Sequence, residues 1–138
     1  MIVYLDTSVV LRKILCESNP LSSWGSWAAA YISEILRVEA LRSIDRLRLT
    51  SELADAEVAE KIKDIHDVLE SVSEIPITPS VLARASQPFP VAVTTLDAIH
   101  LASAVLWREL RREEMLFATH DKRLGAAAET IGFQAIGI

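Results

Sequence analysis

Five short apolar runs are separated by longer segments with helical periodicity, and this alternation limits the folds that the chain can adopt. The runs lie at residues 2–5, 31–32, 74–77, 116–119 and 133–136. They are too short for helices, and Pro76 predicts that the third is an edge strand, because proline lacks a backbone donor. Strands that alternate with helices predict an α/β fold, in which helices cover both faces of a parallel sheet.

Apolar residues at helical spacing predict seven helices. They lie at residues 9–15, 20–27, 33–49, 54–71, 79–87, 96–111 and 122–131. Asn19 followed by Pro20 resembles an N-cap with a first-turn proline, and Gly132 suits the end of the last helix. The third and fourth helices are consecutive and amphipathic, so they should form a helical hairpin on one side of the fold.

Size and composition are those of one globular domain. The chain has 138 residues, of which 51% are hydrophobic and 24% are charged, so we expect a single domain over residues 1–138. No apolar run approaches the ~20 residues of a membrane span, and the N-terminus has an early acid and no basic leader. Cys16 is the only cysteine, which fits a reducing compartment. We therefore expect a cytoplasmic protein with no membrane segment.

Four acidic residues lie where a single carboxylate would be unfavourable. Asp6 ends the first apolar run, and Asp121 follows the fourth. Asp97 opens an apolar helix, and Glu39 falls at the edge of an apolar helical stripe. Ligands of open parallel sheets bind beyond the carboxyl ends of the strands, so Asp6 and Asp121 share one crevice if their strands are neighbours. Carboxylates brought together repel, and a hard divalent cation is their natural partner.

Each acid also has an ordinary structural explanation. Asp6 and Asp121 could cap the helices that follow them, and Asp97 could be the acid at position N3 of a capping box whose N-cap is Thr94. Glu39 could be a surface helix glutamate paired with a residue three or four positions later. These alternatives stay open for each acid alone, and the functional hypothesis depends on the order and spacing of all four.

Four segments, taken in order, resemble the motifs of a PIN domain, and specifically of a VapC-type toxin from a bacterial or archaeal toxin–antitoxin system. They are residues 2–8 ending in Asp6-Thr7-Ser8, residues 33–42 around Glu39, residues 96–104 around Asp97, and residues 117–124 around Asp121. Residues 49–90 match in helical character only. The resemblance implies a three-layer α/β/α fold with a short parallel sheet of about five strands, in which the first strand lies beside the fourth.

The resemblance also implies an endoribonuclease that depends on Mg²⁺ or Mn²⁺. By this resemblance Asp6 and Asp97 are the most direct metal ligands. Glu39 and Asp121 would bind the metal through water, hold a second ion or help to orient the nucleophile. All four acids are thus candidate catalytic and metal-binding residues.

Other residues near the acids have supporting roles in this hypothesis. Ser8 and Thr119 are the expected hydrogen-bonding groups around the carboxylates. The mechanism needs no serine–histidine dyad, and the three histidines are interpreted as structural or peripheral and not catalytic; they are His66, His100 and His120.

Basic residues offset the acidic charge locally. The net charge of −5 by itself disfavours a nucleic-acid partner, but the four acids account for much of it and a cation would neutralise them. The candidate phosphate contacts are Arg37, Arg42, Lys122 and Arg123. Trp24 and Trp27 could stack on bases, but a pair at this spacing on a helix is more typical of a core or an interface.

The same resemblance implies partners. A toxin of this type cleaves RNA, forms a homodimer and is held by a cognate VapB-type antitoxin in a higher assembly. Antitoxins of the family lie across a groove of helices near the active site, and the candidate groove here is the helical hairpin of residues 35–71.

Other α/β proteins with an acid after the first strand fit less well. A phosphatase with an aspartyl nucleophile needs a second acid two residues later, where this chain has Ser8. A phosphoacceptor receiver domain needs paired acids after the first strand and a lysine after a late strand, and neither is found. The remaining alternative is a catalytically inactive PIN-fold module that binds a protein partner, although such a module would not require four acids.

Overall fold

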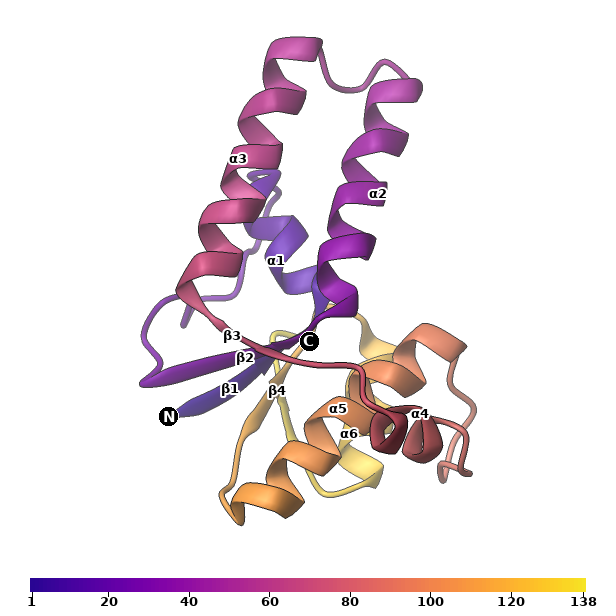
Figure 1. Ribbon diagram of the computed structural model, residues 1–138. Helices are drawn as coiled ribbons and strands as arrows, with labels where there is room; N and C mark the ends of the chain where they lie inside the picture. The colour runs from indigo at the N-terminus through magenta and orange to yellow at the C-terminus, as the bar shows by residue number, and fades with distance from the viewer.

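A computed structural model describes residues 1–138 and contains one sheet of five parallel strands with helices on both faces (Figure 1). The strands are β1 (Ile2–Leu5), β2 (Ala29–Ser33), β3 (Ser73–Ile75), β4 (Leu116–Ala118) and β5 (Gln134–Ile136). Their order is β3-β2-β1-β4-β5, so β1 is central, β4 is its neighbour and β3 is an edge strand. The predicted architecture and the pairing of the first and fourth strands are confirmed.

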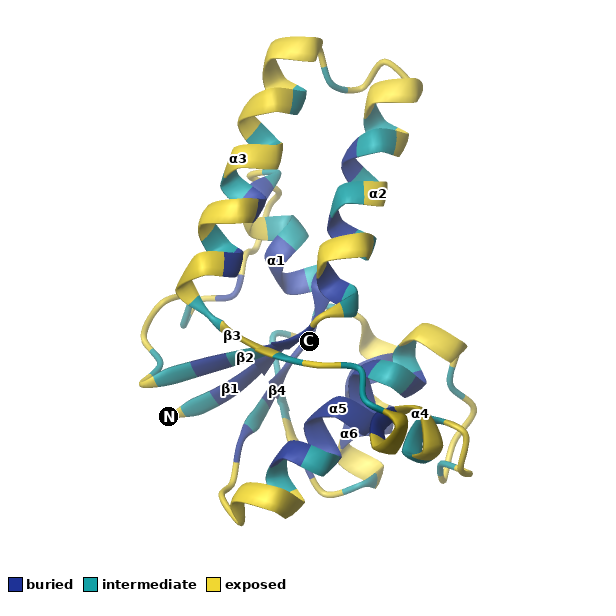
Figure 2. Cartoon of the chain, viewed as in Figure 1, coloured by how far each residue is buried: buried dark blue, intermediate teal, exposed yellow.

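The two faces of the sheet carry separate apolar cores. On one side lie α1 (Thr7–Ile14), α2 (Ile35–Leu49) and α3 (Asp55–Ser71), and on the other lie α4 (Pro79–Ala85), α5 (Thr95–Arg111) and α6 (Lys122–Thr130). Successive strand residues point to opposite faces, so Val3 and Leu5 join the first core while Tyr4 joins the second. The central strands are therefore covered from both sides, as Figure 2 shows in dark blue.

Helices α2 and α3 form the predicted hairpin, which extends away from the sheet (Figure 1). Its buried residues face the sheet side and α1; they are Leu36, Ala40 and Ile44 on α2 and Ile65 and Leu69 on α3. Ile62 on α3 is 36% exposed, and the far end of the hairpin is mostly exposed (Figure 2). The hairpin is thus anchored at its base.

The predicted helix over residues 20–27 is wrong. Asn19 has a left-handed backbone with φ of +54°, so it begins a turn instead of capping a helix, and Gly25 has φ of +80°. Trp24 and Trp27 pack edge to face with their ring centroids 5.2 Å apart, and both are partly buried against the first core. Turns in this segment return the chain to β2, beside β1.

The other predicted elements are present, and their ends differ from the prediction by no more than two residues. The last helix ends at Thr130, and Gly132 follows with φ of +86°, a conformation that favours glycine. No helix combines the length and the hydropathy needed to cross a bilayer.

Candidate active site

The candidate site lies at the carboxyl ends of the two neighbouring central strands. Leu5 pairs with Ala118, and the amide of Asp6 donates to the Ala118 carbonyl over 2.9 Å. Asp6 caps α1, and Asp121 caps α6 by accepting from two backbone amides. The capping role considered for both acids is present, and it holds both carboxylates at the same edge of the sheet.

One oxygen of Asp6 accepts three hydrogen bonds. Oδ2 accepts from the Ser8 hydroxyl over 2.6 Å, the Thr119 hydroxyl over 2.9 Å and the Ser8 amide over 3.3 Å. The two hydroxyl oxygens in turn accept from the amides of His120 and Asp121, each over 3.0 Å. Ser8 and Thr119 therefore tie Asp6 to the connection that carries Asp121. The other oxygen, Oδ1, accepts no hydrogen bond from the protein.

Glu39 reaches the same crevice from α2. Its Oε1 accepts from the Thr7 hydroxyl over 2.9 Å and lies 2.6 Å from Nε2 of His100. Burial alone would raise the pKa of Glu39, but the hydrogen bond and charge of His100, with the Thr7 hydrogen bond, outweigh burial and lower the pKa. Glu39 is therefore held as a carboxylate close to Asp6, the neighbour of Thr7 in the chain.

His100 lies inside the acid cluster and not at its periphery. Its side chain is 1% exposed, with Nδ1 2.7 Å from the Tyr4 hydroxyl and Nε2 3.6 Å from Oδ1 of Asp6. Burial would lower the pKa of His100, but the hydrogen bond to Glu39 and the charges of Asp6 and Glu39 raise it. Sequence reasoning missed this placement, although His100 is one helical turn from Asp97 on α5, so the two share a helix face.

The side chains of the other two histidines form no hydrogen bond or ion pair with the acids. His66 is exposed on α3, and His120 follows β4, where its Nδ1 lies 2.6 Å from the carbonyl of Gly137. Both fit the structural or peripheral interpretation.

Asp97 and Asp121 line one small cavity of about 70 Å³, together with Thr94 and Arg123. Thr94 caps α5, and its hydroxyl oxygen accepts from the Asp97 amide over 3.2 Å. Burial raises the pKa of Asp97, and the negative charges of Asp121 and Asp6 raise it further, against a hydrogen bond from Thr94. The three aspartates thus belong to one electrostatic cluster.

The chemistry of this cluster fits a hard divalent cation. Neither Asp97 nor Asp121 forms an ion pair with lysine or arginine, and Oδ1 of Asp6 is free of hydrogen bonds. Magnesium accepts one or two such carboxylates and keeps several waters. No three acidic, histidine or cysteine side chains converge closely enough to form a complete metal-binding group. The acids therefore share a crevice without forming a closed coordination shell.

The four candidate phosphate contacts differ in position. Arg123 lines the small cavity, and Lys122 beside it is exposed at the start of α6. Arg42 lines a groove on α2 next to Glu39. Arg37 lies 3.5 Å from a glutamate of β3 and so is engaged at the sheet edge. Arg42, Lys122 and Arg123 are the three that lie near the acids.

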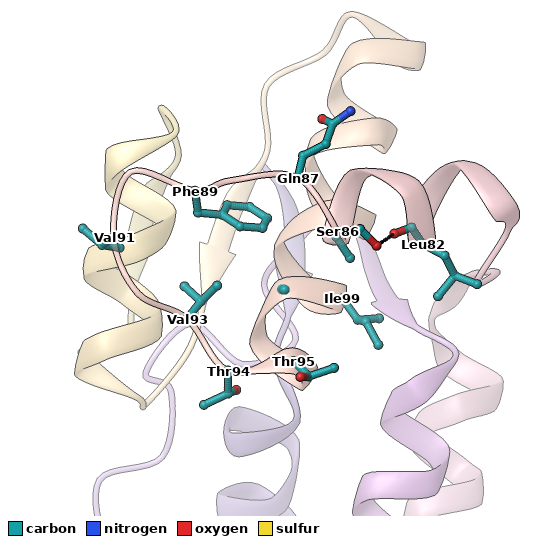
Figure 3. A pocket seen from close by; sticks show the side chains of 11 residues that line it. Leu82, Ser86, Gln87, Phe89, Val91, Val93, Thr94, Thr95 and Ile99 are labelled. Carbon is teal, nitrogen blue, oxygen red and sulfur yellow. Dashed lines mark hydrogen bonds between the residues drawn. The ribbon is translucent and has the colours of Figure 1, made fainter.

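A larger cavity of about 490 Å³ lies between α4, the connection to α5 and the first turns of α5 (Figure 3). Its lining includes Phe89, Val93 and Ile99 and contains no charged residue. Thr94 lines this cavity as well as the acidic one, so the two adjoin. Since a lining of apolar and uncharged polar residues provides no general base and no carboxylate for a metal, the candidate chemistry remains at the acids.

Replacing Asp97 by Asn should stabilise the protein at neutral pH in the absence of divalent metal. Folding raises the pKa of Asp97 above its usual value of 3.8. At pH values between 3.8 and the raised pKa, the folded state therefore binds more protons than the unfolded state. The contribution of Asp97 to stability therefore falls as the pH rises through this interval. Because the side chain is partly exposed, we expect a gain below about 1 kcal/mol.

Urea unfolding with EDTA at about pH 7 and about pH 3.5 measures this effect, and the gain should vanish at the lower pH. Asp55→Asn, at an exposed acid on the far end of the hairpin, is the matched control and should bring no gain. A gain of the same size at both pH values would contradict the repulsion argument.

Comparison with protein families identifies the fold and one relative. The PIN domain family matches residues 3–130. Ribonuclease VapC47 of Mycobacterium tuberculosis (strain CDC 1551 / Oshkosh) is 30% identical over 138 residues, which covers 95% of this chain and 93% of that protein.

Solved structures with the same fold include three assemblies. A toxin–antitoxin complex from Klebsiella pneumoniae aligns with a TM-score of 0.63 at 17% identity, over 93% of each chain. VapBC2 from Rickettsia felis, bound to a DNA fragment from its promoter, aligns with a TM-score of 0.68 at 11% identity, over 98% and 97% of the two chains. FitAB bound to the IR36 DNA fragment aligns with a TM-score of 0.68 at 18% identity, over 99% and 94%. At these identities the structures establish the fold, and together with the family match and the relative they show that the chain belongs to the PIN-domain family.

Proposed function

We propose that this chain is a metal-dependent endoribonuclease, that it is the toxin of a VapBC-type toxin–antitoxin module, and that residues 1–138 form a single PIN domain. The observation that carries the proposal is the gathering of four acids at the carboxyl ends of β1 and β4; they are Asp6, Glu39, Asp97 and Asp121. Ribonuclease VapC47, the relative at 30% identity, supports RNA as the substrate.

The aspartates would hold Mg²⁺ or Mn²⁺. Asp6 would bind through Oδ1, since its Oδ2 is occupied by Ser8 and Thr119, and Asp97 would bind from the first turn of α5. Asp121 would bind through water or hold a second ion. When bound, such a metal lowers the pKa of a coordinated water and stabilises negative charge on the phosphate and the leaving oxygen.

Residues of the chain would orient the reactants. Glu39 is a carboxylate with one oxygen held by Thr7 and His100, and its Oε2 is left to accept a proton from the attacking water or to orient it. Arg42 and Arg123 flank the acids and would contact the phosphates on either side of the cleaved bond, with Lys122 and Arg37 farther along the RNA.

The α2 surface offers a place for the antitoxin. A groove of about 480 Å³ runs along α2 from Ile35 past Glu39 to Leu49, and Leu96 also lines it. Val38 is 54% exposed and Leu49 is 67% exposed along this groove, which suits the apolar face of a VapB-type segment. The predicted hairpin thus contributes chiefly through α2.

A homodimer and a higher assembly with antitoxin are part of the same proposal. Exposed leucines away from the groove, such as Leu82 and Leu110, leave apolar surface for a second copy of the chain. We place the protein in the cytoplasm, where its single exposed cysteine, Cys16, would stay reduced.

The purified protein should cleave RNA in the presence of Mg²⁺ or Mn²⁺. Cleavage should stop when EDTA removes the metal and return when excess Mn²⁺ is added, because the clustered carboxylates need the cation to neutralise them. Gel electrophoresis of end-labelled transfer, ribosomal and messenger RNA measures the products. Cleavage that continues without metal would contradict the proposal, and inactivity towards every RNA and metal would favour the inactive binding module.

A further inference from the structure

We propose that His100 is a positioning residue, whose Nε2–H holds the carboxylate of Glu39 and whose ring is held in turn by the hydroxyl of Tyr4. The inference rests on the proposed nuclease function and extends it to two residues outside the four acids. It is carried by a continuous chain of hydrogen bonds from the centre of the sheet to the crevice.

The inner end of this chain is rigid. Tyr4 is 0% exposed on the central strand, and its ring stacks on Phe117 with centroids 5.0 Å apart and planes 19° apart. The Tyr4 hydroxyl lies 2.7 Å from Nδ1 of His100, and the two rings meet edge to face. A buried aromatic ring in a packed core has little freedom, so Tyr4 fixes both the position and the rotation of the imidazole.

The outer end of the chain determines where the imidazole proton lies. Nε2 of His100 is 2.6 Å from Oε1 of Glu39, and a carboxylate oxygen can only accept, so Nε2 carries a proton. In a neutral ring Nδ1 is then an acceptor, and the Tyr4 hydroxyl donates to it. In the neutral ring Tyr4 thereby favours the tautomer that donates to Glu39, and in the charged ring Nε2 donates to Glu39 as well.

Glu39 needs such support because it comes from a different helix and has three rotatable bonds. The Thr7 hydroxyl and His100 converge on the same oxygen, Oε1, from α1 and α5. With one oxygen held from two sides, the plane of the carboxylate is set and Oε2 is left for the reactants. Partners of this kind typically change activity or metal affinity by about 10–100-fold when they are removed.

Two amide substitutions at His100 test the role of the Nε2 donor independently of the rest of the imidazole ring. The amide of glutamine in His100→Gln can reach the place of Nε2, whereas the shorter asparagine in His100→Asn reaches only the place of Nδ1. We expect His100→Asn to lower kcat for RNA cleavage about 10–100-fold with little change in KM. His100→Gln should recover most of this loss, and Tyr4→Phe should cause a smaller loss than His100→Asn.

A buried serine provides the control for disturbance of α5. Ser103 is 0% exposed, lies one turn beyond Ile99 on the same helix, and donates to the Ile99 carbonyl over 2.8 Å. Ser103→Ala should leave kcat unchanged. Equal kcat for wild type and His100→Asn would overturn the proposal, and so would an equal loss in the Asn and Gln variants at matched thermal stability.

A measurement without RNA or metal separates this inference from the proposed function. In NMR spectra of the protein with ¹⁵N-labelled histidine, the Nε2–H proton of His100 should be visible and protected from exchange. Glu39→Gln should shift that resonance, and Tyr4→Phe should shift the Nδ1 resonance. The positioning role would be overturned if Nε2 of His100 carried no proton, or if its resonance did not shift in Glu39→Gln. If the wild type cleaves no RNA while these shifts appear, the nuclease assignment fails and the contact stands.

Discussion

The Asp6→Asn protein should cleave RNA roughly 10³-fold more slowly than the wild type, because several kcal/mol of charge stabilisation depend on the cation that Asp6 would hold. The fold should persist. In the wild type the Ser8 and Thr119 hydroxyls donate to Oδ2 of Asp6 over 2.6 and 2.9 Å. The amide oxygen of asparagine can still accept both hydrogen bonds. Initial rates of RNA cleavage at saturating Mn²⁺ measure the effect, and thermal unfolding shows that the variant is folded.

Asp55→Asn makes the same chemical change at an exposed acid on α3 and should leave the cleavage rate unaltered. Equal cleavage rates for the wild type and Asp6→Asn would show that the acid cluster takes no part in the mechanism. It would also indicate that the observed activity comes from another nuclease in the preparation.

Phe117→Ala should destabilise the protein by about 3–5 kcal/mol, since a fully buried aromatic side chain is lost from a central strand. Phe117 lies between two rings, with its centroid 5.0 Å from that of Tyr4 and 5.7 Å from that of Phe133. The cavity would open beside Tyr4, so His100 would also lose part of its support. Urea unfolding followed by circular dichroism measures the free energy of unfolding.

Leu110→Ala is the control for this prediction. Leu110 is 84% exposed near the end of α5, so its truncation should change the free energy of unfolding by no more than about 0.5 kcal/mol. A loss below about 1 kcal/mol for Phe117→Ala would mean that the second core repacks around the cavity.

Most strands and helices could be predicted because their signals are local. The run at residues 2–5 and the apolar stripe of α2 need no knowledge of distant residues, and both elements lie where they were expected. Residues 20–27 were mispredicted because Asn19-Pro20 suits a turn as well as a helix start. In the structure Asn19 has a left-handed backbone and Gly25 has a positive φ, and both conformations belong to turns and not to a helix.

The candidate acids could be singled out from the sequence because a carboxylate beside an apolar run is unusual, and because their order resembles a known family. Their distances and charge states could not be predicted in this way. The pairing of Leu5 with Ala118 brings Asp6 and Asp121 to one edge, and α2 and α5 bring Glu39 and Asp97. These contacts join residues far apart in the chain, so local patterns do not encode them individually.

The sequence by itself determined the alternation of strands and helices and the parallel sheet through residue type and local spacing, and it singled out the four acids through their order, which resembles that of a known family. Only the tertiary structure decided that His100 stands between Tyr4 and Glu39, which are 96 and 61 residues away from it. A histidine on an apolar helix face has the same local pattern whether it meets carbon atoms or a carboxylate. What it meets is set by the packing of α5 and α2 around the end of β1, and hydrogen-bonding partners follow from that packing.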